Sequence, residues 1–178
     1  GLYLLPTGAG KSLVGYMILR LLNMKALIIV PTKLLVKQLS NDFETYGHTE
    51  GTHQLFSGME KNSDKQITIA TWQSVARMPR DWLQQYDAIV VDEAHGAKAK
   101  QLTGVLERAT NVYYRFGVTG TLDDIKTNVM VLEGLFGPVE RIRTSAELME
   151  EGHLAGIKIS FLLLQYPEEE RRLFWSGD

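Results

Sequence analysis

Short apolar runs alternate with longer amphipathic segments along most of the chain, and this alternation predicts its secondary structure. Each run has the length and composition of a strand that is covered on both faces. The predicted strands span residues 2–5, 26–30, 66–70, 87–91 and 113–118, with a further short strand at 54–56.

Between the strands, apolar residues recur at helical spacing. In residues 11–22 this spacing places Leu13, Met17 and Leu21 on one side of a helix. The other predicted helices span residues 33–43, 101–109 and 126–136, and a short one ends near Pro79. Strands that alternate with helices predict an α/β fold with a mostly parallel sheet, right-handed crossovers and helices on both faces.

Polar motifs directly follow these strands. The carboxyl ends of parallel strands meet at one edge of a sheet, where open α/β folds bind their ligands. We therefore expect the motifs to converge on a single functional edge.

The first motif joins the first strand to the first helix. It consists of Pro6, Thr7, Gly8, Ala9, Gly10, Lys11 and Ser12. A glycine loop before a helix offers backbone N–H groups and a positive helix end to phosphates. Lys11 is expected to reach the β- and γ-phosphates of a nucleotide, and the Ser12 hydroxyl to bind Mg²⁺. The alternative is a glycine-rich turn before an ordinary helix.

This motif departs from the general phosphate-binding pattern at one position. The pattern begins with glycine where this chain has Leu5.

Asp92 and Glu93 directly follow the apolar run at 87–91. Asp92 is expected to hold Mg²⁺ opposite Ser12, directly or through water, and Glu93 to orient or deprotonate the attacking water. The metal would compensate for the cost of burying two carboxylates. The alternative is a solvated acidic loop after a strand.

His95 completes this acidic motif, and Thr119, Gly120 and Thr121 follow the last predicted strand of the sheet. Hydrogen bonds between His95 and the segment near Thr119 would link nucleotide state to the rest of the domain. The alternatives are a surface histidine and a simple turn. His48, His53 and His153 show no metal-ligand spacing, and we expect them at the surface.

Two further motifs suit contacts with a nucleic-acid backbone. They consist of Pro31, Thr32 and Lys33 after one strand, and of Thr71, Trp72, Gln73 and Ser74 after another. Hydroxyls, helix-start amides and a lysine can bind phosphodiesters without reading sequence. Helix capping by Thr32 and Ser74 uses the same geometry, so both roles can hold. Trp72 could stack on a base, but a core position fits a tryptophan there better.

Composition limits the remaining possibilities. The 178 residues suit one domain, and the absence of cysteine excludes disulfides and cysteine–zinc sites. No apolar run approaches the ~20 residues that span a bilayer, so no membrane contact is expected. The net charge is −2, so nucleic acid would have to bind in a local groove rather than to a basic surface.

Together, these motifs resemble the first RecA-like motor domain of superfamily 2 DExH helicases, over about residues 1–121. In this family the first glycine of the phosphate loop is commonly absent, which accounts for Leu5. The resemblance implies a RecA-like P-loop NTPase fold, ATP and Mg²⁺ as cofactors, and nucleic acid, DNA more than RNA, as a partner. It also implies that Thr119, Gly120 and Thr121 couple ATP hydrolysis to movement on nucleic acid.

Within this superfamily the chain is most similar to phage UvsW-type recombination and repair helicases. The similarity is carried by residues 3–12, 71–74, 135–137 and 148–152. Bacterial XPB-like proteins and restriction-enzyme motor subunits share much of the pattern. The resemblance implies remodelling of branched DNA, in the cytoplasm of a bacterium or a phage-infected host cell.

We expect the chain to be a piece of a longer protein. Residues 1–143 would form the first RecA-like domain. Residues 144–178 would be a connector helix and the first strand, near 157–166, of a second RecA-like domain that carries an arginine finger. An alternative function is a nucleotide-binding and nucleic-acid-docking module with negligible turnover without that second domain.

Overall fold

The computed structural model describes residues 1–6, 8–94, 99–120, 126–155 and 160. The strands are β1 (Leu2–Leu4), β2 (Ala26–Val30), β3 (His53–Leu55), β4 (Ile67–Thr71), β5 (Ala88–Asp92), β6 (Tyr114–Thr119) and β7 (Val139–Arg141). The helices are α1 (Lys11–Leu22), α2 (Lys33–Thr45), α3 (Trp72–Ala76), α4 (Arg80–Leu83), α5 (Ala99–Arg108), α6 (Lys126–Phe136) and α7 (Ser145–Glu150).

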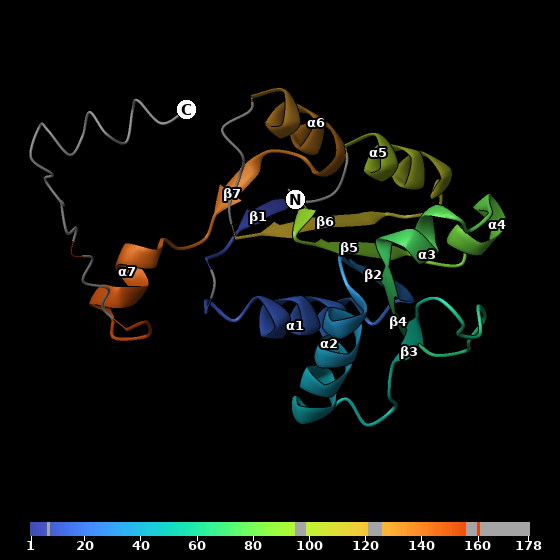
Figure 1. Ribbon diagram of the computed structural model, residues 1–178, viewed down its shortest axis with the longest axis horizontal. Coiled ribbons are helices and arrows are strands. Elements are labelled where there is room, and N and C mark those ends of the chain that lie inside the picture. Colours follow the sequence, from blue (N-terminus) through green and yellow to red (C-terminus); the bar gives the residue numbers. More distant parts are fainter. Residues whose placement is uncertain (7, 95–98, 121–125, 156–159, 161–178) are drawn as a thin grey trace, which may run out of the picture.

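The strands form one parallel sheet in the order β3-β4-β2-β5-β6-β1-β7. Helices α1 and α2 cover one face, and α3, α4, α5 and α6 cover the other (Figure 1). The predicted α/β architecture is confirmed, since every predicted strand and helix up to residue 136 is present with its ends shifted only slightly.

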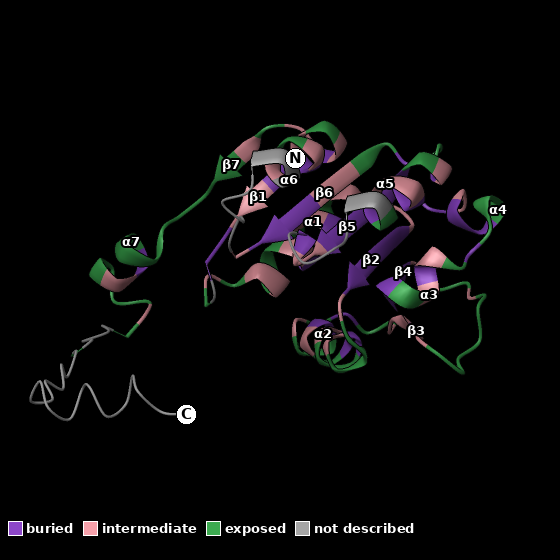
Figure 2. Cartoon of the chain, turned by 45° about the horizontal axis from the view of Figure 1, so that its top comes forward, coloured by how far each residue is buried: buried purple, intermediate pink, exposed green. Residues whose placement is uncertain are grey.

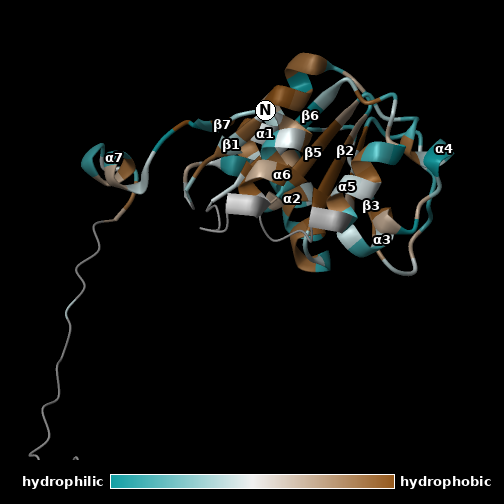
Figure 3. Ribbon diagram, turned by 90° about the horizontal axis from the view of Figure 1, so that it is seen from above, coloured by the Kyte–Doolittle hydropathy of each residue, from teal (hydrophilic) through white to brown (hydrophobic). Residues whose placement is uncertain are grey.

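The core consists of two layers, one on each face of the sheet. In one layer Tyr16 and Phe43 pack on inward-facing strand residues, and in the other Trp82 and Leu106 do so. Strand β2 is buried and apolar along its length, and β5 is so up to Val91, as Figures 2 and 3 show by colour. Burial on both faces explains why uninterrupted apolar runs identified these strands.

Strand β7 was not predicted. It pairs with β1 at the edge of the sheet, with Leu2 opposite Val139. Its remaining residues, Glu140 and Arg141, are exposed. An edge strand with polar residues carries no apolar run, which is why the sequence pattern did not reveal it.

One expectation about burial was wrong, that for His48, and the sequence had left the inner side of α1 open. Leu13, Met17 and Leu21 are 41%, 54% and 84% exposed, and α1 packs on the sheet through Tyr16 and Leu19 instead. Because α1 carries apolar residues on most of its circumference, spacing could not select the inner side. His48 is 2% exposed rather than at the surface, because it follows the end of α2 and packs edge-on against the Tyr16 ring. His53 is half-buried and His153 is exposed.

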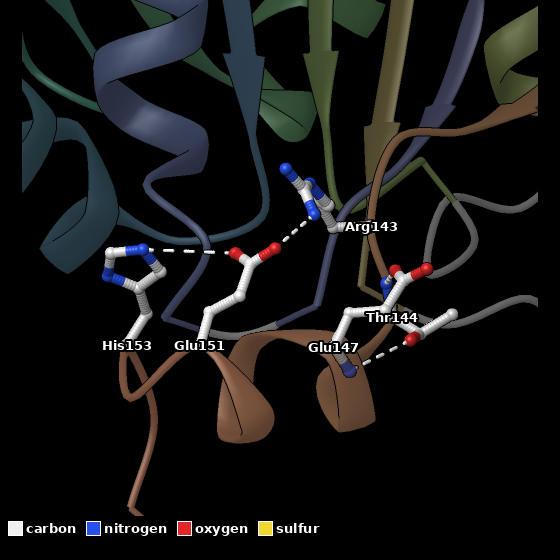
Figure 4. A network of polar contacts seen from close by, with 5 residues as sticks. All are labelled: Arg143, Thr144, Glu147, Glu151 and His153. Carbon is white, nitrogen blue, oxygen red and sulfur yellow. Dashed lines mark hydrogen bonds and ion pairs between the residues drawn. The ribbon is translucent and has the colours of Figure 1, made fainter.

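Helix α7 lies apart from the sheet (Figures 1 and 2). The Thr144 and Glu147 side chains form a capping box at its start. After its end, Glu151 pairs with Arg143 at 2.5 Å and lies 3.8 Å from His153 (Figure 4). These exposed contacts hold the local turn rather than dock the helix on the sheet. The predicted strand near 157–166 and the tail lie outside the described residues, apart from Ser160.

Candidate functional site

The loop between β1 and α1 has the backbone shape of a phosphate-binding loop. Gly8 and Gly10 adopt φ angles of +84° and +76°, which side chains other than glycine rarely allow. Gly10 is also the N-cap of α1 and supplies no side-chain cap, so the first N–H groups of the helix remain available to an anion. Pro6 accepts a hydrogen bond from the Ala9 N–H at 3.1 Å, which closes the turn. Thr7 lies outside the described residues.

Lys11 and the acidic motif meet at this loop. The Lys11 Nζ donates a hydrogen bond to Glu93 Oε1 at 3.1 Å. The Glu93 N–H donates to Asp92 Oδ1 at 3.0 Å, and Glu93 adopts φ +51°, an uncommon angle for a residue with a side chain. The strained backbone at Glu93 is typical of a functional position, because the chain holds it against a conformational cost.

The carboxyl group of Asp92 has a raised pKa. Burial is the main cause and the negative charge of Glu93 adds to it, while the hydrogen bond from the Glu93 N–H and the charge of Lys11 oppose it. A bound cation would reverse this balance, because it stabilises the ionised carboxylate. Asp92 therefore lies where a cation would offset the cost of its negative charge.

An open cavity of about 440 Å³ lies above the loop. Its walls are Gly8, Gly10, Lys11, Ser12, Asp92 and Glu93, together with Leu35, Gln38, Leu39 and Asp42 of α2. This size is within the range of small-molecule sites. The α2 wall was missed from the sequence, although its residues recur at helical spacing on one face.

The described residues contain no group of three or more histidine, aspartate or glutamate side chains that could hold a metal. Mg²⁺ does not need such a cage, since it is commonly bound by one or two protein oxygens plus substrate phosphates. Ser12 and Asp92, which both line the cavity, fit that donor set. The Ser12 hydroxyl also lies 3.0 Å from the Tyr46 hydroxyl, a contact that the sequence did not predict.

The Thr119 motif lies between the two motifs just described. Strand β6 pairs with β1 on one side and with β5 on the other, so that Leu4 lies opposite Thr119 and Asp92 opposite Val118. Thr119 is fully buried, and its carbonyl accepts a hydrogen bond from the Leu5 N–H at 2.9 Å. His95 and Thr121 lie outside the described residues, and Gly120 is half-buried.

The two motifs expected to contact nucleic acid form one cavity of about 420 Å³, because β2 and β4 are neighbours with Val30 opposite Thr71. We call it the β2–β4 groove. Its walls are Pro31, Thr32, Lys33, Ser57, Thr71, Gln73, Ser74 and Arg77. Ser57 and Arg77 were missed, because they lie outside the recognisable motifs and only the fold brings them to the groove.

Local contacts decide between the alternatives for these motifs. Thr32 Oγ1 accepts a hydrogen bond from the Leu35 N–H at 3.2 Å, so Thr32 caps α2 as expected. Ser74 is not a cap, because it lies inside α3 and its hydroxyl pairs with that of Thr71 at 3.0 Å. Trp72 is 8% exposed, belongs to the core and is absent from the groove wall, which favours the core position over base stacking.

Residues 1–124 match the family described as type III restriction enzyme, res subunit. The chain belongs to this family. It is 35% identical over 176 residues to the ATP-dependent DNA helicase UvsW of Enterobacteria phage T4, covering 93% of this chain and 35% of that protein. It is 28% identical over 176 residues to the DNA 3'-5' translocase XPB2 of Sulfurisphaera tokodaii, covering 98% of this chain and 38% of that protein.

The crystal structure of the UvsW helicase from bacteriophage T4 matches with a TM-score of 0.72 at 32% identity, over 79% of this chain and 53% of that one. These matches confirm the RecA-like fold and the similarity to UvsW-type helicases that the motifs indicated. The chain spans only 35% and 38% of the length of the two curated relatives. In the part of the chain that the structure describes, no helix is long and apolar enough to cross a membrane.

Proposed function

We propose that this chain is the first motor domain of an ATP-dependent DNA helicase or translocase. The observation that carries the proposal is the convergence of the Lys11 loop and the Asp92–Glu93 pair on one cavity, at the same sheet edge as the β2–β4 groove. The names of the phage and archaeal relatives support the same activity.

In this proposal the loop N–H groups and the start of α1 bind the nucleotide phosphates, and Lys11 contacts the β- and γ-phosphates. Ser12 and Asp92 would hold Mg²⁺, which would supply positive charge beside the β- and γ-phosphate oxygens, where negative charge develops as the bond between them breaks. Glu93 orients or deprotonates the attacking water. It does so once the Lys11 ammonium has moved from the Glu93 carboxylate to the phosphates. Thr119 ends β6, which lies between β1 and β5, and transmits the change in nucleotide state toward a second domain.

The β2–β4 groove would bind the sugar–phosphate backbone of one strand. Thr32, Ser57 and the amides at the start of α2 can donate hydrogen bonds, while Lys33 and Arg77 supply positive charge. The Lys33 ammonium lies 5.8 Å from the centre of the Phe56 ring, which restrains it beside the groove. DNA rather than RNA is proposed from the names of the relatives.

We also propose that residues 1–143 form the first RecA-like domain and that 144–178 lead into a second one. The family match, which ends at residue 124, and the position of α7 apart from the sheet support this division. ATP would clamp the two domains together, and hydrolysis would release them and move the strand. The proposed location, the cytoplasm of a bacterium or a phage-infected host cell, depends on the phage relative alone.

The convergence of the Lys11 loop and the Asp92–Glu93 pair on one cavity also favours a second candidate function. By itself the chain would bind nucleotide and nucleic acid with negligible turnover, because catalysis would need groups from the second domain. Measuring ATP hydrolysis and ATP binding by this chain, with and without single-stranded DNA, separates the two. DNA-stimulated turnover supports the motor by itself, binding without turnover supports the docking module, and no ATP binding contradicts both.

A further inference from the structure

A hydrogen bond joins the phosphate loop to the far end of α2. The Ser12 hydroxyl and the Tyr46 hydroxyl lie 3.0 Å apart, and either can be the donor. Ser12 is the first-turn hydroxyl of α1 that lines the nucleotide cavity, whereas Tyr46 is the C-cap of α2. Neither the function proposed above nor the sequence motifs give Tyr46 a role.

Tyr46 is held in place by both its backbone and its ring. Its N–H donates to Asp42 O at 2.9 Å, and Gly47, at φ +90°, ends α2 with the His48 N–H donating to Phe43 O. This is the hydrogen-bond pattern of a glycine C-cap, which fixes the direction of the chain. The Tyr46 ring lies 5.7 Å from the Tyr16 ring, centre to centre. The phenol therefore points at Ser12 from a rigid support.

A serine hydroxyl has one proton to donate and two lone pairs to offer. When Ser12 gives its proton to Tyr46, both lone pairs are left free for a cation. A free hydroxyl would instead rotate among several orientations, and many of these point its proton toward the metal. A hydrogen bond to a fixed acceptor removes that freedom before the ligand arrives.

We propose that Tyr46 is a positioning residue that orients the Ser12 hydroxyl for a divalent cation bound with a nucleotide. The inference rests on the proposed function, since it requires Mg²⁺–ATP to bind in this cavity. Helix α2 begins at Lys33, which lines the β2–β4 groove, and is followed directly by Tyr46, so a single helix adjoins both cavities.

The test is Tyr46→Phe, which removes the hydroxyl and keeps the ring. Tyr16→Phe is the matched control, because it removes a phenol from the same aromatic cluster, and the Tyr16 hydroxyl makes no hydrogen bond to another described residue. Binding of a fluorescent ATP analogue is titrated with Mg²⁺. We expect Tyr46→Phe to raise the Mg²⁺ concentration at half-saturation about 2- to 10-fold, the range of one hydrogen bond, and Tyr16→Phe to leave it unchanged.

A double-mutant cycle separates positioning from general damage. With Ser12→Ala as background, adding Tyr46→Phe is expected to change nothing further, because the hydroxyl to be oriented is gone. Nucleotide affinity in excess EDTA and the melting temperature are expected to match the parent chain. The inference is overturned if Tyr46→Phe leaves the Mg²⁺ concentration at half-saturation unchanged or lowers it. It is also overturned if Tyr46→Phe raises that concentration equally in the Ser12→Ala background. If the parent chain shows no Mg²⁺-dependent nucleotide binding, the proposed function itself fails.

Discussion

The Lys11 ammonium lies 3.1 Å from the Glu93 carboxylate, although 82 residues separate them in the sequence. They meet because β1 and β5 end at the same sheet edge, with only β6 between them. Both side chains are partly buried, at 18% and 30% exposure. A nucleotide that takes Lys11 for its phosphates would break this ion pair, and the proposed roles of Lys11 and Glu93 would thereby be linked.

Lys11→Ala should weaken ATP binding at least about tenfold, because a charge-assisted contact with the phosphates is lost. Turnover of the complete enzyme should be abolished. Folding should change little, since the ion pair with Glu93 is partly solvated. Fluorescent-nucleotide titration measures the affinity, with Lys65→Ala at the opposite sheet edge as the control. Equal affinity in the Lys11→Ala variant and the parent chain would contradict the phosphate-binding role.

Glu93→Gln should separate binding from hydrolysis. The amide keeps the size of the side chain and an oxygen that can accept from Lys11, but it cannot take a proton. We expect ATP affinity within about twofold of the parent, while hydrolysis by the complete enzyme falls by ~10² or more. Single-turnover hydrolysis measures the chemical step. A parallel fall in affinity and hydrolysis would mean that Glu93 supports the metal site or the loop instead.

Asp92→Asn should stabilise the domain while weakening Mg²⁺-dependent nucleotide binding. The raised pKa of Asp92 means that the folded domain favours the protonated carboxyl. The stability that this group provides is therefore full at low pH and is lost as pH rises through the raised pKa. In metal-free buffer at pH 7 the variant should melt higher, by about 2–4 °C for each ~1 kcal/mol relieved. The difference should vanish toward pH 4, and a difference that is constant across pH would refute the electrostatic cause.

Sequence reasoning recovered the parts of the molecule that local chemistry specifies. Buried parallel strands, the glycine loop and the Asp92–Glu93 pair each leave a short contiguous signal. It missed β7, the inner side of α1, and Arg77, because these depend on which segments become neighbours. The Tyr46–Ser12 contact, for example, requires α2 to end beside the start of α1, and no spacing along the chain encodes that.

Arg77→Ala should weaken binding of single-stranded DNA, which we expect to be weak and strongly salt-dependent in this chain. Arg77 lines the β2–β4 groove with Thr32 and Lys33, so its loss should remove about one phosphate contact. The slope of log affinity against log salt should then decrease by about 0.7. Fluorescence anisotropy across a salt series measures this, with Arg20→Ala on α1 as the control. An unchanged slope would mean that Arg77 does not contact a DNA phosphate in the β2–β4 groove.

The boundary proposed near residue 143 predicts how the chain tolerates truncation. Leu154, after α7, lies against the phosphate loop, since a Cβ at Gly8 would be 2.6 Å from its Cδ2. Beyond it, Phe161, Leu162, Leu163 and Leu164 form an apolar run whose partners we expect in a second domain.

A chain ending at Gly156 keeps Leu154 and loses that run, so nucleotide affinity and melting temperature should hold while solubility improves, because an apolar segment without its partner sheet is removed. A chain ending at Arg143 also loses α7 and the contact of Leu154 with the phosphate loop but retains β7, so it should still fold, with a nucleotide affinity no higher than that of the chain ending at Gly156. Thermal melting and nucleotide titration of the two truncated chains check this. If the chain ending at Gly156 unfolds, the removed segment belongs to this sheet and the domain extends past 143.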